Sequence, residues 1–133
     1  MKNIIRLFTL TFLLNFLVSC DPAHNIDFIN KSDSNVKVKI TLNPKVENYR
    51  LKEVSSGDSI VFNLKQKDTA NIYFGIGTWS DGEIEELTIS INNIEIETKD
   101  IKTLYKTKKA MKNILEKNTH GFWFKTLVEI NIE

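Results

Sequence analysis

The sequence has a single cysteine, Cys20, and only two histidines in 133 residues. One cysteine leaves no partner for a disulfide bond within the chain. No GxSxG or HExxH pattern is present, so neither histidine stands in a recognised catalytic motif. The few glycines include a GxG pattern at Gly75 and Gly77, but no predicted helix follows it, as a phosphate-binding loop would require. We therefore expect a protein that is not an enzyme and has no cofactor.

A metal site is not expected either. Asp21, His24 and Asp27 are metal-ligand types spaced by three residues, which would share a face only on a helix. Pro22 and the strand pattern after it oppose a helix, and ordering a flexible segment costs roughly 1–2 kcal/mol per residue. The other histidine, His120, is expected in a loop after a helix, with no nucleophile marked beside it.

Long hydrophobic runs are also absent. The longest apolar segment, residues 7–18, is interrupted by Thr9, Thr11 and Asn15. As a helix it would reach about 18 Å, against a bilayer core of roughly 30 Å, so it is too short to span a membrane. A basic start followed by a short apolar segment is typical of a secretory signal.

The end of this segment is more specific. Leu17-Val18-Ser19-Cys20 resembles the lipobox of bacterial lipoproteins, a leucine three residues before a cysteine with small or aliphatic residues between. The resemblance implies cleavage between Ser19 and Cys20, a thioether-linked diacylglycerol on Cys20 and acylation of the new amino group. Two or three acyl chains make a stable membrane anchor, whereas one chain binds only marginally. Cys20 is thus predicted to be an attachment point and not a nucleophile.

Cleavage defines the expected domain organisation: a signal peptide at 1–19, a lipidated tether at 20–25 and a β-sandwich domain at 26–133. Removing Lys2 and Arg6 changes the formal charge from +1 to about −1, which argues against a nucleic-acid partner. The body, rich in Lys, Asn and Ile, is similar to small lipoproteins of the Bacteroidota, which implies the outer membrane of a Gram-negative cell. Surface-exposed members carry several acidic residues after the cysteine. Only Asp21 follows here, which favours the periplasmic side.

The body of the chain reads as short strands separated by turns. Val36 to Leu42 alternates apolar and polar residues throughout, which predicts a half-buried strand. It is expected to form an opening hairpin with a first strand at 26–29, across a linker dense in turn formers. Residues 86–91 and 94–98 predict a second hairpin around Asn92-Asn93, or one long bent strand. The other strands are predicted at 59–64, 71–78, 101–105 and 127–133.

One segment has helical periodicity. Residues 107–118 place Ala110, Met111, Ile114 and Leu115 on one face and lysines on the other. The predicted fold is therefore a mainly antiparallel β-sandwich, immunoglobulin-like in shape, with one short helix covering an edge or an open end.

Aromatic residues supply the first candidate binding site. In the strand at 71–78, strict alternation puts Ile72, Phe74 and Ile76 on one side. Tyr73 and Trp79 share the other side with only glycines between them, which could form a shallow groove for a sugar or a peptide. Trp123 is a further candidate, because alternation sends it away from both neighbouring phenylalanines. The alternative is that these rings simply close the core.

Lysines supply the second candidate. The predicted helix carries Lys108, Lys109, Lys112 and Lys117, which would contact anionic head groups if the tether holds the helix near the membrane. The alternative is that this basic segment faces the acidic segment at 81–97. The favoured function is a lipid-anchored, non-enzymatic module that binds an envelope protein near the membrane. The alternative function is a glycan- or small-ligand-binding sandwich that uses exposed Trp and Tyr rings.

Overall fold

The computed structural model describes residues 22–45, 48–121 and 124–133. In these residues eight strands form two four-stranded sheets, sheet A with the order β4-β1-β8-β7 and sheet B with the order β3-β2-β5-β6. The strands are β1 (Ala23–Asn30), β2 (Val36–Leu42), β3 (Ser59–Leu64), β4 (Thr69–Ile76), β5 (Ile91–Glu97), β6 (Lys102–Tyr105), β7 (Thr119–His120) and β8 (Leu127–Ile132). The helices of the described residues are α2 (Tyr49–Val54), α3 (Asp81–Ser90) and α4 (Lys108–Lys117).

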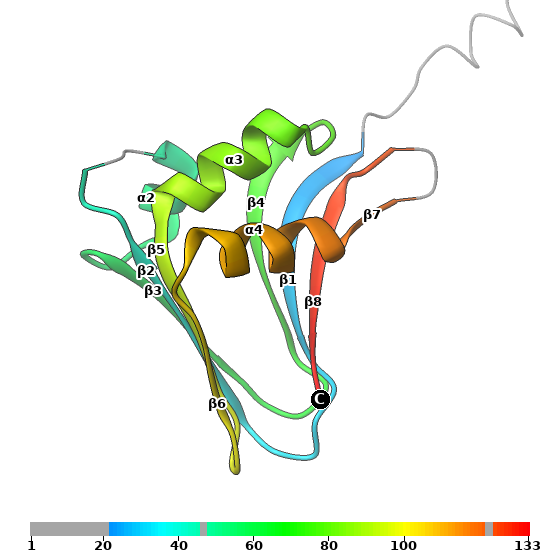
Figure 1. Ribbon diagram of the computed structural model, residues 1–133. Coiled ribbons are helices and arrows are strands. Elements are labelled where there is room, and N and C mark those ends of the chain that lie inside the picture. Colours follow the sequence, from blue (N-terminus) through cyan, green and yellow to red (C-terminus); the bar gives the residue numbers. More distant parts are fainter. Residues whose placement is uncertain (1–21, 46–47, 122–123) are drawn as a thin grey trace, which may run out of the picture.

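The two sheets form a sandwich-like pair of layers. Figure 1 shows them close together at the lower end of the view and diverging towards the upper end, where α3 and α4 lie between them. Apolar side chains from both sheets and from the helices fill the interior, among them Phe28, Ile40, Leu87 and Leu115. The prediction of a mainly β, mostly antiparallel sandwich is therefore confirmed at this level. One strand pair, β1 with β8, is parallel.

The alternating segment at 36–42 forms β2 as predicted. Val36, Val38, Ile40 and Leu42 are all buried, and β2 lies inside sheet B between β3 and β5. Burying an aliphatic side chain contributes about 1.5–3 kcal/mol, so this inward row is a large part of the sheet's stability.

The predicted opening hairpin is wrong. The first strand exists, but β1 lies in sheet A between β4 and β8, whereas β2 lies in sheet B. The linker at 31–35 crosses from one sheet to the other instead of folding back. Asn30 is fully buried at this crossing, and its side-chain amide donates to the carbonyl oxygens of Ser34 (2.8 Å) and Lys65 (2.9 Å). Turn-forming residues predict a change of direction, but not which strand the chain pairs with next.

The predicted strand at 86–91 is also wrong, because these residues belong mostly to α3. Ser80 and Glu83 form a capping box, in which the Ser80 hydroxyl accepts from the Glu83 amide (3.2 Å) and the Glu83 carboxylate accepts from the Ser80 amide (2.9 Å). Ile84, Leu87 and Thr88 then form one buried face. The sequence motif S-x-x-E predicts such a start, although the glycine at 82 suggests a turn. Asn92-Asn93 consequently lies inside β5 and is not a hairpin turn.

The pairing of residues 101–105 across Lys99-Asp100 is confirmed, since β6 runs antiparallel to β5. The predicted helix is confirmed as α4, where the Thr107 hydroxyl accepts from the Ala110 amide (3.1 Å) and Met111, Ile114 and Leu115 are buried. The short helix α2 was not predicted. Its single buried side chain, Leu51, leaves no helical periodicity to detect.

Candidate functional site

The amino-terminal end of the domain lies beside the predicted anchor. Cys20, Ser19 and the whole predicted signal peptide fall outside the described residues. The predicted tether at 20–25 is shorter than expected, because β1 already begins at Ala23. Hydrogen bonds hold this start in place: the Gly77 amide donates to the Pro22 carbonyl (3.1 Å) and the Asn25 amide to the Thr126 carbonyl (3.2 Å). Only two residues separate Cys20 from Ala23, so an anchor at Cys20 would lie next to sheet A.

In the described ranges no helix has the length and apolarity needed to cross a membrane. Over the same residues, no three His, Cys, Asp or Glu side chains lie close enough together to hold a metal ion.

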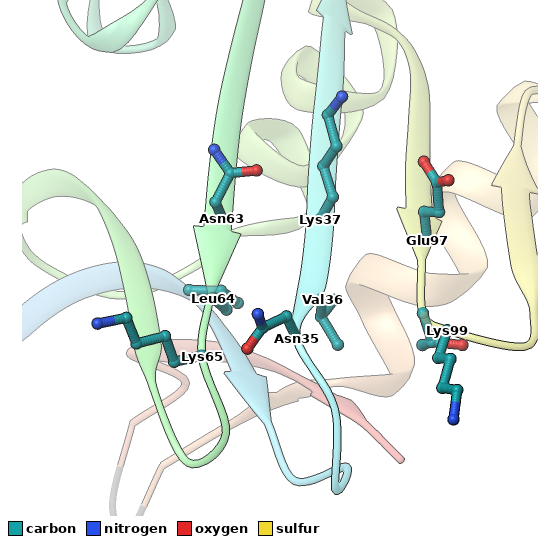
Figure 2. A pocket seen from close by; sticks show the side chains of 9 residues that line it. Asn35, Val36, Lys37, Asn63, Leu64, Lys65, Glu97 and Lys99 are labelled. Atoms are coloured by element: carbon teal, nitrogen blue, oxygen red, sulfur yellow. The ribbon is translucent and has the colours of Figure 1, made fainter.

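A polar pocket of about 480 Å³ lies at the opposite end of the molecule (Figure 2). It is formed where β2 begins and where β3 and β5 end. Its lining residues are Asn35, Val36, Lys37, Asn63, Leu64, Lys65, Glu97, Thr98 and Lys99. β1 runs from Ala23 towards this pocket, because the side-chain amide of Asn30 at its other end donates to the carbonyl oxygens of the pocket residues Leu64 and Lys65. Eight extended residues span about 23 Å, so the pocket lies roughly that far from Ala23.

The pocket lining combines hydrogen-bonding groups with an excess of positive charge, because it contains three lysines and one glutamate. On sheet B, Lys37 lies in register between Asn63 of β3 and Glu97 of β5. Figure 2 shows the amines of Lys37, Lys65 and Lys99 pointing in different directions. Such a lining suits a neutral or mixed-charge polar ligand better than a phosphate, which needs donors that converge on one point. Sequence reasoning missed this pocket because its residues come from three separate strands.

The predicted groove between Tyr73 and Trp79 is not present. In the β1–β4 register Asn25 faces Tyr73 and Ala23 faces Ile76. Moving two residues along β1 therefore corresponds to moving three residues along β4. This is a β-bulge, and Gly75 within it has a φ of 102°, which favours glycine. One extra residue reverses the alternation beyond it. Ile76 therefore joins Tyr73 on the outer face, and the strand parity that linked Tyr73 to Trp79 is lost.

Trp79 is buried instead, with 5% of its surface exposed. Its ring lies 3.9 Å from the His24 ring and 5.0 Å from the Phe74 ring, measured between centroids. Its indole N–H donates to the carbonyl oxygen of Asn25 (3.2 Å). The alternative interpretation, that this tryptophan closes the core, describes what is found. Tyr73 is half exposed, and Trp123 lies outside the described residues.

His24 lies beneath Trp79 and is itself buried. Burial lowers the pKa of His24, and the nearby Glu83 carboxylate partly opposes this effect. Within the described part of the chain, the Nε2 atom of His24 has no hydrogen-bond partner. His24 therefore packs as a core residue, with its ring tilted by 59° against that of Trp79.

A smaller cavity of about 130 Å³ lies on the other side of Trp79, between α2, β4 and α3. The Arg50 guanidinium lies 4.6 Å from the Tyr49 ring centroid, at the edge of this cavity. The Asn48 side-chain amide donates to Glu86 (2.7 Å) beside it. One guanidinium and the carboxylates of Glu83 and Glu86 line the cavity, so it has no preference for an anion.

One lysine of α4 contacts the neighbouring acidic helix α3. The Lys112 amine lies 3.0 Å from the Glu85 carboxylate of α3 and 3.8 Å from that of Glu116. The hydrogen bond with Glu85 raises the pKa of Lys112. Together α3 and α4 carry four lysines and five carboxylates, a net charge of −1. The two-helix layer is therefore not a basic patch, although Lys108, Lys109 and Lys117 are exposed.

A second group of charges lies on the outer face of sheet A. His120, predicted in a loop, lies in β7, and its Nε2 atom is 2.6 Å from a Glu129 carboxylate oxygen. Glu129 is in register with Asp27 on β1. Burial raises the pKa of Asp27, and the neighbouring Glu129 charge raises it further.

The chain matches no family model, no curated protein and no solved structure.

Proposed function

We propose that this protein is a lipid-anchored module of the bacterial cell envelope that binds a protein or another envelope component without catalysing a reaction. The observation that carries the proposal is the placement of the two ends. The strand after the lipobox-like Leu17–Cys20 segment starts at one end of the domain, and the polar pocket lies at the other. A domain anchored through Cys20 would present this pocket away from its membrane.

The pocket supports a polar ligand. Three lysines, two asparagines, strand-end backbone groups and one carboxylate offer both donors and acceptors, which suits a loop of a partner protein. The second candidate, a glycan or small polar ligand, is favoured by the same lining and by a volume within the usual range of small-molecule sites. It would use hydrogen bonds in this pocket, since Trp79 is buried.

The location is part of the proposal. The lipobox resemblance supports a diacylglycerol on Cys20, and the similarity to Bacteroidota lipoproteins supports the outer membrane, with the periplasmic side favoured. The immunoglobulin-like shape also stays a prediction, supported by the two packed sheets.

The anchor is tested by mass spectrometry of the amino-terminal peptide from the membrane fraction. We expect the wild-type peptide to begin at Cys20 and to carry the mass of its acyl chains. The Cys20→Ala protein should leave the membrane fraction. An unmodified Cys20 in a membrane-bound protein would refute the anchor.

The pocket is tested by capture of envelope components with the full-length protein. Asn63→Tyr places a bulky ring in the pocket, whereas Val61→Tyr places the same ring two residues away on the same face of β3. Both native side chains are exposed, so neither change disturbs the core. We expect a stoichiometric component to bind the wild type and Val61→Tyr but not Asn63→Tyr. Equal capture by both variants would exclude this pocket.

A further inference from the structure

Apolar side chains are exposed at the end of sheet A where the chain enters the domain. Ile76 is 65% exposed, Phe124 is 63% exposed and Tyr73 is 49% exposed. Ile76 and Tyr73 lie on the same outer face because of the bulge at Gly75. We call Tyr73, Ile76 and Phe124 the apolar rim.

The apolar rim lies beside Ala23, where the chain enters sheet A. Ile76 is the register partner of Ala23, the first residue of β1. The adjoining segments are joined by hydrogen bonds, from the Gly77 amide to Pro22 and from the Trp79 amide to Lys125. Glycine at position 121 permits a close approach to Phe124, because a Cβ there would overlap the Phe124 carbonyl group. Tyr73 and Ile76 cannot move away from Ala23 without breaking the pairing of β1 with β4.

The length of the tether limits where the rim can be. Cys20 lies three residues before Ala23, and three extended residues span at most about 10 Å. An acylated cysteine lies at the surface of the hydrocarbon layer, so Ala23 and its partner Ile76 lie within the head-group region or at its outer edge. Tyrosine and tryptophan are enriched at that depth in membrane proteins, and Tyr73 is the rim residue of this kind.

We propose that the apolar rim is the surface with which the folded domain contacts the lipid bilayer. This inference rests on the proposed anchor at Cys20 and adds an orientation to it. The end of sheet A that contains Ala23 and Ile76 faces the bilayer, and the lysines of α4 are not the principal contact. The chemistry agrees, since the two-helix layer has a net charge of −1 and gains little from anionic lipids.

The test uses the full-length, lipidated protein in vesicles of phosphatidylethanolamine and phosphatidylglycerol. Lipidation occupies Cys20, so one introduced cysteine can carry an environment-sensitive dye. The matched pair is Ile76→Cys and Ile101→Cys, because both isoleucines are 65% exposed and Ile101 lies in the β5–β6 hairpin at the far end. Lys109→Cys reports on α4. Nitroxide groups on the shallow part of the lipid chains act as the quencher.

We expect a blue shift and loss of emission at position 76, and neither change at 101 or 109. Equal quenching at 76 and 101, in protein that floats with the vesicles, would overturn the rim and leave the anchor intact. Quenching at 109 without quenching at 76 would assign the contact to α4 and overturn the rim as well. Protein that neither floats nor carries a lipid on Cys20 would refute the anchor, and the rim with it.

Discussion

Replacing Asn30 by alanine should destabilise the domain more than any surface change. The side chain is fully buried where the chain crosses from sheet A to sheet B. Its side-chain amide donates to the carbonyl oxygens of Ser34 and Lys65. Its side-chain oxygen accepts from the backbone amide (3.0 Å) and the hydroxyl (2.7 Å) of Ser32. A net hydrogen bond contributes about 0.5–1.5 kcal/mol, so losing these four should cost about 3 kcal/mol.

The cost is large against a typical stability of about 5–15 kcal/mol. For a domain of this size it corresponds to a fall in Tm of roughly 10 °C. Urea unfolding followed by circular dichroism gives the free energy of unfolding, with an unchanged m-value confirming that only stability has changed.

Asn131→Ala is the control, because Asn131 is exposed on β8 and its loss should change stability by about 0.5 kcal/mol or less. A loss below about 1 kcal/mol for Asn30→Ala would refute the reasoning, since it would mean that water or neighbouring groups replace the buried amide. Asn30 also connects the two linkers beside the polar pocket. Relative to the wild type, amide hydrogen exchange in the variant should therefore increase more in those two linkers than elsewhere in the domain.

Three further changes test other parts of the fold. Gly75→Ala should lower the free energy of unfolding by about 1–2 kcal/mol, because Gly75 has a positive φ. The control Gly82→Ala, inside α3, should be neutral or stabilising. Equal urea midpoints for the two variants would contradict the bulge. Ser80→Ala should cost about 1 kcal/mol by removing the cap of α3, and an unchanged Tm would argue against it. Asp27→Asn should raise Tm near neutral pH. Because the pKa of Asp27 is raised in the folded state, the folded wild type binds this proton more tightly than the unfolded chain does. The wild type therefore loses stability as the pH rises from the ordinary aspartate pKa through the raised value. In thermal melts this gain should vanish in acid below that window, and a gain that is the same at every pH would exclude titration of Asp27 as the cause.

Local periodicity predicted those parts of the fold that local contacts decide. β2 and α4 each show one apolar face in the sequence, and each is found with that face buried. The linker after Asn30 carries equally clear turn residues, but its sheet assignment depends on β4 and β8, which are distant in sequence. Such pairings leave no short-range pattern.

The candidate site was predicted less completely for a related reason. Counting alternate residues through Gly75 and Gly77 assumes an unbroken strand, and one bulge moved Trp79 into the core and Ile76 to the surface. Glycine in a strand is itself a signal of a bulge, so the error had a visible source. The polar pocket, by contrast, is assembled from three strand ends whose proximity is set by the sheet order alone.

The parallel pairing of β1 with β8 makes the first strand of the domain depend on the last. β1 lies inside sheet A, and its partner β8 is the last strand of the described residues. Sheet A therefore cannot form around β1 until the chain has been synthesised as far as β8. Contacts between such distant residues also predict slow folding, on the time scale of other domains rich in non-local strand pairs.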